Sequence, residues 1–189
     1  MIIGLTGTFG AGKGEVSKIL MSRGYIYHSC SDVLRTELRS KGQAETIENL
    51  AKIGNEIRET RGAGELPKRL IEIIRRRNEP KAIIDSIRSI GEVEELKVEK
   101  DFVLLSIEAP IDIRYQRIKR RGRHGDDLSF DQFKNLEAAQ MHGEGATQNL
   151  GKCMNIADYK ISNVGSLDEL RENVEAVMDE VERTWPPAS

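Results

Sequence analysis

The sequence has few of the features that disulfide-stabilised or metal-binding proteins need. Its 189 residues include only two cysteines, Cys30 and Cys153. Two are too few for a disulfide framework, and their separation does not match the spacing of a zinc site. A reducing compartment is the simpler interpretation, and both cysteines are expected to be small buried side chains.

Charge of one sign and long apolar runs are also missing. The chain has 29 basic and 31 acidic residues, which give a formal net charge of -2. No overall electrostatic field therefore attracts nucleic acid or an anionic membrane. No segment approaches the roughly 20 apolar residues of a membrane span. The first residues, MIIGLTG, have no basic region and too short an apolar run for a signal peptide. The sequence therefore predicts a cytoplasmic protein with no membrane or nucleic-acid partner.

Strand and helix patterns alternate from end to end, which predicts an α/β fold with a mainly parallel five-stranded sheet and helices on both faces. The length fits a single domain, residues 1–189. Short apolar runs predict strands at 1–6, 25–28, 81–86, 102–107 and 159–162. Helical spacing predicts helices at 12–23, 31–40, 46–61, 66–77, 91–100, 111–121, 129–141 and 167–184. Of these, the helix at 91–100 is expected to be a charged surface helix.

A glycine-rich segment between the first strand and the first helix carries the most specific signal. Residues 7–13 read G-x-x-x-x-G-K, the spacing of a P-loop. Its glycines let backbone N–H groups turn inward around a phosphate, and the lysine adds a mobile positive charge. The motif predicts a three-layer P-loop NTPase fold that binds ATP or GTP. The residues expected to hold the donor nucleotide are Gly7, Phe9, Gly10, Ala11, Gly12, Lys13, Gly14 and Glu15.

The end of this motif departs from the usual form. Gly14 and Glu15 follow Lys13, whereas a serine or threonine hydroxyl normally helps to hold Mg²⁺. Glu15 is either a solvated residue of the first helical turn or a metal ligand through water, and Ser17 is a weaker substitute. If no residue replaces the hydroxyl, the metal site is impaired.

Two further segments resemble nucleoside monophosphate kinases. Ser31-Asp32-Val33-Leu34-Arg35 is similar to a motif of that family whose arginine binds the acceptor phosphate, a role the resemblance gives to Arg35. Asp85-Ser86-Ile87-Arg88 ends the third predicted strand, where that family carries Asp-Gly-x-Pro-Arg. The resemblance implies that Asp85 holds Mg²⁺ through water and that Arg88 bridges donor and acceptor phosphates.

The resemblance extends to a lid. Residues 111–123, IDIRYQRIKRRGR, resemble the helix whose arginines close over the transferring phosphoryl group. It implies catalytic roles for Lys13, Arg88, Arg117 and Arg121, with Arg123 as a weaker match. It also implies an acceptor-binding helical insert at about 31–80 and a lid at about 114–141.

A second resemblance leads to a different acceptor. The opening Ile3-Gly4-Leu5-Thr6-Gly7 and the closing ADYKISNVGS of residues 157–166 are similar to dephospho-coenzyme A kinases. Those enzymes phosphorylate a ribose hydroxyl with an aspartate as base, and the resemblance implies that Asp32 is this base and contacts the acceptor. The chain as a whole resembles a group of archaeal and bacterial kinase-like proteins.

Three functions follow. The first is a kinase that transfers the γ-phosphoryl group to a nucleotide such as a (deoxy)nucleoside monophosphate. The second is a dephospho-coenzyme A kinase-like 3′-hydroxyl kinase, and the third is a non-catalytic nucleotide sensor, which Glu15 favours. The expected partner is the small phosphate acceptor, and the protein is expected to be a monomer or a homodimer.

Overall fold

The computed structural model describes residues 1–122, 127–142 and 148–184. In this part of the chain five strands form one sheet in the order β2-β3-β1-β4-β5, and all four neighbouring pairs are parallel. The strands are β1 (Ile2–Thr6), β2 (Ile26–Ser29), β3 (Ala82–Asp85), β4 (Phe102–Glu108) and β5 (Tyr159–Ser162). The predicted five-stranded parallel sheet is confirmed.

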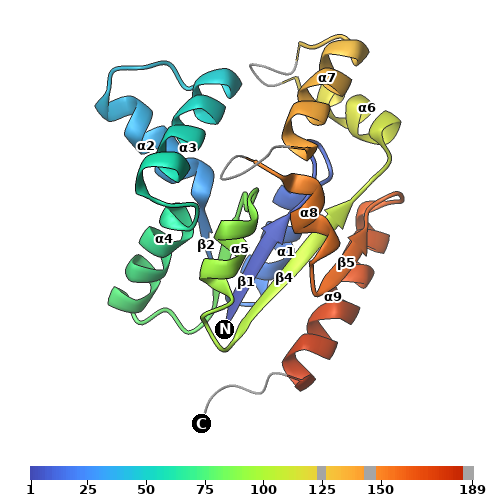
Figure 1. Ribbon diagram of the computed structural model, residues 1–189. Helices are drawn as coiled ribbons and strands as arrows, with labels where there is room; N and C mark the ends of the chain where they lie inside the picture. The colour runs from blue at the N-terminus through green and yellow to red at the C-terminus, as the bar shows by residue number, and fades with distance from the viewer. Residues whose placement is uncertain (123–126, 143–147, 185–189) are drawn as a thin grey trace.

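Helices cover both faces of the sheet (Figure 1). On one face lie α1 (Lys13–Ser22) and α9 (Leu167–Thr184), whose apolar side chains pack on those of Ile3 and Leu5. The opposite face carries the neighbouring side chain of Ile2 and is covered by α2 (Cys30–Ser40), α3 (Ile47–Arg61), α4 (Glu65–Arg76), α5 (Ile90–Leu96) and α8 (Leu150–Asn155). Successive strand side chains point to opposite faces, so apolar runs such as IIGLT supply both layers.

Two helical regions extend beyond the carboxyl ends of the strands (Figure 1). One contains α2 and α3, and the other contains α6 (Ile111–Arg121) and α7 (Phe130–Met141). Parallel α/β sheets bind their ligands at this edge. The fold therefore places the glycine-rich turn after β1 between these two regions.

The expected surface helix at 91–100 is wrong in length and in character. The helix α5 ends at Leu96, and Glu92, Val93 and Leu96 are buried. A capping box explains its start, because Ser89 Oγ accepts from the Glu92 amide and the Glu92 carboxylate accepts from the Ser89 amide. The burial of Glu92 contradicts the interpretation of this segment as a surface helix, which rested on its many charged residues.

The helix α8 was not predicted from the sequence. Its six residues, LGKCMN, are too short to show a helical repeat, and it depends on Asn149 as its cap.

Both cysteines are buried, as expected, with Cys153 on this helix. No helix within the described residues is long and apolar enough to cross a membrane.

Candidate functional site

The turn between β1 and α1 has the backbone of a phosphate cradle. Gly12 lies at the N-cap of α1 with a φ of 105°, a left-handed backbone conformation that residues other than glycine rarely adopt. A Cβ atom on Gly12 would collide with the side-chain amide of Asn163. Among the described residues no side chain caps the N-terminus of α1, and the Glu15 amide donates to the Gly12 carbonyl oxygen (2.9 Å), which leaves the amides of Lys13 and Gly14 to an anion.

Lys13 is folded back over this turn. Its Nζ donates hydrogen bonds to the carbonyl oxygens of Gly7 (2.6 Å) and Thr8 (3.2 Å). Burial lowers the pKa of Lys13 from 10.5 to about 8; the negative charge of Asp85 opposes this shift, and the cations Arg88 and Arg114 add to it. The ammonium group therefore lies among charged residues from several elements, close to where the outer phosphates of a nucleotide would bind.

Asp85, the last residue of β3, presents a buried carboxylate beside the cradle. Its Oδ2 accepts a hydrogen bond from the hydroxyl of Tyr27 (2.9 Å), and Oδ1 accepts from the Ser86 amide (2.5 Å). Burial and the negative charge of Asp85 raise the pKa of Tyr27. Ser86 has φ of 68°, unusual for a residue with a side chain, and this turn leads directly to Arg88.

Glu15 lies apart from this carboxylate. Its Oε1 accepts a hydrogen bond from Lys18 Nζ (2.8 Å) one turn further along α1, and its side chain is 44% exposed. Ser17 is buried, and its hydroxyl donates to the carbonyl oxygen of Lys13 (3.0 Å). The metal-binding roles of Asp85 and Glu15 stay predictions, and Asp85 has the more suitable position because it is buried among the charges of the cradle.

A cavity of about 130 Å³ lies next to the cradle, between the two helical regions. Its polar lining includes Arg35, Arg58, Arg88, Gln140 and Gln148. Its apolar lining is formed by Phe9, Cys30, Leu34, Ile47, Leu50, Ala51 and Leu136. An adjoining cavity of about 440 Å³ between α3 and α7 shares Ile47, Ala51 and Leu136 with it. An anionic group and an apolar ring system would both find suitable surroundings here.

The structure brings Arg35 and Arg88, both predicted from the sequence, to this same cavity. Arg35 donates to Asp32 Oδ1 (2.7 Å), and Asp32 itself is 60% exposed and is not among the described residues that line the cavity. Arg88 donates weakly to Gln148 Oε1 (3.5 Å), and burial lowers the pKa of its guanidinium. The roles of these residues, and of Asp32 as a base, stay predictions.

The predicted lid arginines contact the cradle in different ways. Arg117 donates to the backbone oxygen (2.9 Å) and the side-chain oxygen (3.3 Å) of Asn163, which lies against Gly12. The guanidinium of Arg121 lies over the ring of Phe9, 5.3 Å from its centre. Arg123 lies outside the described residues.

Arg114 binds the lid to the cradle more firmly than either predicted arginine. It is 3% exposed, donates to the Phe9 carbonyl oxygen (3.1 Å), and forms an ion pair with Glu137 of α7. The ring of Phe9 packs against Phe133 of α7, with centres 6.1 Å apart. The cradle and the helices α6 and α7 therefore form one packed unit.

Five polar residues of this site were not predicted from the sequence, namely Arg58, Glu92, Arg114, Gln148 and Asn163. Arg114 follows a helical spacing with Arg117 and Arg121, at i, i+3 and i+7, and this spacing could have revealed it. Arg58 and Glu92 are 34 residues apart, and no local pattern relates them. Only the fold brings them into contact.

The fold and the glycine-rich cradle define a P-loop protein with a kinase-like α/β fold. A family model described as an AAA domain matches residues 3–142. A UPF0200 protein of Pyrococcus horikoshii is 32% identical over 191 residues, covering 98% of this chain and 100% of that protein. The chain therefore belongs to the AAA-domain family and to the UPF0200 proteins.

Solved structures share the fold. A shikimate kinase from Bacteroides thetaiotaomicron superposes with a TM-score of 0.60 at 12% identity, covering 96% of this chain and 98% of that one. A dephospho-CoA kinase from Campylobacter jejuni superposes with a TM-score of 0.54 at 18% identity, covering 97% and 98%. At these identities the likeness shows the P-loop kinase fold and leaves the acceptor open. The resemblance to this class of kinases that the sequence indicated is confirmed.

Proposed function

We propose that the protein is a nucleoside monophosphate kinase-like phosphotransferase that moves the γ-phosphoryl group of ATP or GTP to the phosphate of a nucleotide. One observation carries this proposal: Arg35, Arg58 and Arg88 line the cavity beside the cradle, whereas no aspartate or glutamate is among its described lining residues and the ion-pair partners Asp32 and Glu92 lie outside that lining. A hydroxyl acceptor requires a base, whereas a phosphate is already an oxyanion and requires positive charge. The lining of the cavity supports the second kind of acceptor.

The residues would divide the work as follows. The amides of the cradle and Lys13 would hold the β and γ phosphates, and Arg35 and Arg88 would hold the acceptor phosphate in line. An oxygen of the acceptor phosphate would form a bond to the γ-phosphorus of the donor. The bond between the γ-phosphorus and the β-γ bridging oxygen would break at the same time. The products would be a nucleoside diphosphate from each partner. Arg117 and Arg121 would add positive charge from the lid.

A magnesium ion would neutralise phosphate charge at this site. Asp85 suits such an ion, because a buried carboxylate among cations is an oxygen donor of the kind that Mg²⁺ prefers. It would hold the ion through water. Neither Gly14 nor Glu15 offers a hydroxyl, so Asp85 would carry more of this role than it would in a chain with serine or threonine at one of these positions.

A coupled assay of ADP release tests the proposal. Purified protein with Mg²⁺ and ATP, or GTP, is tested with AMP, GMP, CMP, UMP, dCMP and dephospho-coenzyme A, and with no acceptor. Turnover with a monophosphate supports the proposal. Turnover with dephospho-coenzyme A alone would favour the 3′-hydroxyl kinase, with Asp32 as base. Nucleotide binding without any turnover would favour the sensor.

The Arg88→Ala variant sharpens this assay. Loss of one phosphate-binding arginine should lower turnover by about 10³-fold. Donor affinity should change little, because the cradle and Lys13 bind the donor. A loss confined to donor affinity would contradict the role given to Arg88. Arg75→Ala is the matched control, because Arg75 is an exposed arginine that pairs with Glu99 and is not among the described residues that line the cavity.

A further inference from the structure

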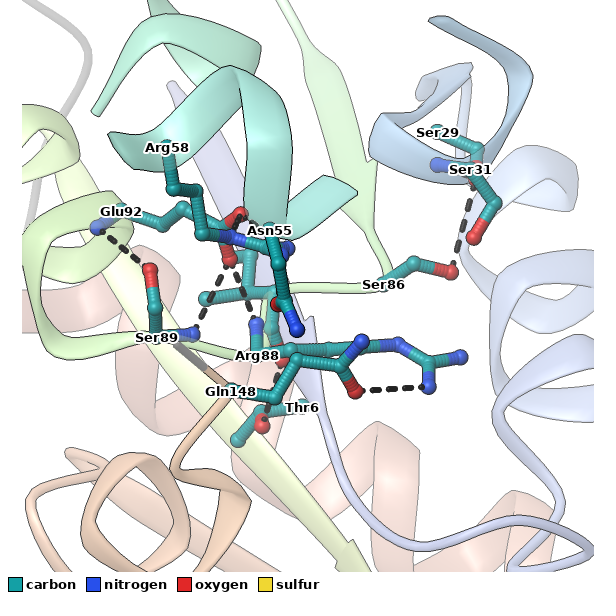
Figure 2. A network of polar contacts seen from close by, with 11 residues as sticks. Thr6, Ser29, Ser31, Asn55, Arg58, Ser86, Arg88, Ser89, Glu92 and Gln148 are labelled. Atoms are coloured by element: carbon teal, nitrogen blue, oxygen red, sulfur yellow. Dashed lines mark hydrogen bonds and ion pairs between the residues drawn. The ribbon is translucent and has the colours of Figure 1, made fainter. Parts of the chain in front are cut away.

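Glu92 occupies the centre of a polar network beneath the cavity (Figure 2). Its carboxylate is fully buried and accepts hydrogen bonds from the main-chain amides of Arg88 (2.6 Å) and Ser89 (3.1 Å) through Oε2. Its Oε1 accepts from Nε (2.9 Å) and Nη2 (2.8 Å) of Arg58. One carboxylate thus joins the turn after β3 to the helix α3.

Arg58 provides the second half of this network. It is 2% exposed, its remaining Nη1 donates to Asn55 Oδ1 (3.4 Å), and it lines the cavity. The burial of both partners means that neither charge is screened by water, so removing one partner alone would leave the other charge uncompensated. The cavity wall formed by α3 and the turn that carries Arg88 are held in one arrangement.

The network fixes the backbone of Arg88 from both sides. Its N–H points to Glu92, and its carbonyl oxygen accepts from the Asn149 amide (2.7 Å). The next residue back in the turn, Ile87, accepts from the hydroxyl of Thr6 through its carbonyl oxygen (3.0 Å). The side chain of Arg88 lies beside that of Gln148, to which it donates (Figure 2), and both residues line the cavity.

We propose that Glu92 and Arg58 are positioning residues that aim Arg88 at the acceptor; this inference rests on the proposed function. Replacing a buried ion pair by apolar residues of similar volume often leaves a protein equally stable. A requirement for stability alone does not therefore explain the pair. Its placement on the Arg88 amide does, because a guanidinium binds a phosphate well only when its planar fork is correctly oriented.

Two readouts test the inference. The first is hydrogen exchange at the Arg88 and Ser89 amides, and the second is calorimetry with AMP and CMP as acceptor probes and ATP as donor. Glu92→Gln should speed exchange at both amides by about tenfold or more, as expected when a hydrogen bond to a charged group is lost. Affinity for AMP or CMP should fall by about tenfold, and affinity for ATP should stay within about twofold.

Two further variants guard against a merely structural effect. Arg58→Met combined with Glu92→Met leaves no unpaired buried charge, although the Arg88 and Ser89 amides lose their acceptor. The folded double variant should show the same loss of acceptor affinity. Glu79→Gln is the matched control. Glu79 is also a buried carboxylate, paired with His28 at 2.6 Å, but it does not line the cavity. It should leave both readouts unchanged.

The outcomes separate the inference from the proposed function. Unchanged exchange in Glu92→Gln overturns the inference, and so does normal acceptor affinity in the folded double variant. An equal loss in Glu79→Gln also overturns it. If the wild-type protein binds neither AMP nor CMP and transfers phosphate to no acceptor, the proposed function fails. Hydrogen exchange alone then decides whether Glu92 holds Arg88.

Discussion

The side-chain amide of Asn163 donates a hydrogen bond to the carbonyl oxygen of Ala11 (2.7 Å) from a loop 152 residues away in the sequence. The same side chain accepts from Arg117 and occupies the space that a Cβ atom on Gly12 would need. Asn163 therefore connects the loop after β5, the lid helix α6 and the phosphate cradle.

Asn163→Ala should weaken ATP binding. Removing this amide leaves the Ala11 carbonyl oxygen without its partner, and we expect a loss of about 1 kcal/mol in the free energy of unfolding and a several-fold loss of ATP affinity. Asn173→Ala is a matched control, since Asn173 donates to the Ser162 carbonyl oxygen (3.1 Å) at an exposed position nearby. Thermal unfolding and calorimetry measure the two effects. Equal ATP affinity in both variants would count against a supporting role for Asn163.

The pKa of Lys13 predicts how donor binding depends on pH. Its folded-state value of about 8 lies below the ordinary 10.5, so between these values the unfolded chain binds more protons than the folded one. Over this window the free energy of unfolding of the ligand-free protein should rise with pH. ATP affinity should fall over the same window, because the phosphates bind the charged ammonium.

Calorimetry with ATP between about pH 7.5 and 9.5 measures the effect, which should approach tenfold per pH unit at most. Lys13→Arg is the control, because a guanidinium stays charged throughout this range. A pH-independent ATP affinity in the wild-type protein, or the same pH dependence in Lys13→Arg, would contradict the assignment. Lys13→Ala should abolish turnover while leaving the protein folded.

Gly14→Ser should improve the metal site. A Cβ atom at Gly14 meets nothing within 4 Å, and the position is exposed in the first turn of α1. The added hydroxyl stands where P-loops usually provide a ligand for Mg²⁺. We expect the Mg²⁺ concentration that gives half-maximal turnover to fall several-fold. Gly14→Ala gains helix propensity without adding a hydroxyl. An equal improvement in that variant would contradict the view that the hydroxyl binds Mg²⁺.

Asp85 and Glu15 should differ sharply in their effect on Mg²⁺. Asp85→Asn should raise the Mg²⁺ requirement at least about tenfold, because it removes a buried charge beside the cradle. Glu15→Gln should change it less than about twofold, since Glu15 is paired with Lys18 at the surface. Titration of the Mg²⁺ dependence of turnover compares the two. The opposite ranking would give the metal-binding role to Glu15.

The Asp85→Asn variant has an independent readout. The negative charge of Asp85 contributes to the raised pKa of Tyr27, after the larger effect of burial. Removing this charge should therefore lower the pKa of Tyr27, which an ultraviolet titration of tyrosinate detects. An unchanged titration would show that the carboxylate and the phenol are not coupled as the structure describes.

The cradle and the sheet could be predicted because their signals are local. The spacing of Gly7, Gly12 and Lys13 lies within seven residues, and buried parallel strands appear as short apolar runs. Arg35 and Arg88 could be proposed because the segments that carry them, residues 31–35 and 85–88, resemble motifs of nucleoside monophosphate kinases. Both arginines line one cavity in the structure, and their roles in binding an acceptor stay predictions.

Other features could not be predicted because they arise from contacts between distant segments. Glu92 belongs to the acidic stretch GEVEEL and reads as a surface residue until α3 brings Arg58 against it. The helix α8 is too short for any periodic pattern, and its cap matters because Asn149 also binds the Arg88 backbone. A charged side chain is rarely buried without an oppositely charged partner, and the sequence of one segment does not show which distant residue will be that partner.

The sequence by itself determined that a strand, a glycine-rich turn and a helix would form a P-loop, since backbone conformation and helix polarity are local properties. The tertiary structure alone decided what surrounds that loop. It brought Arg58 to Glu92 and Asn163 to Ala11, because burial of the apolar faces of the helices sets which distant polar groups meet. The orientation proposed for Arg88, and with it the proposed acceptor site, rests on the contact between Arg58 and Glu92.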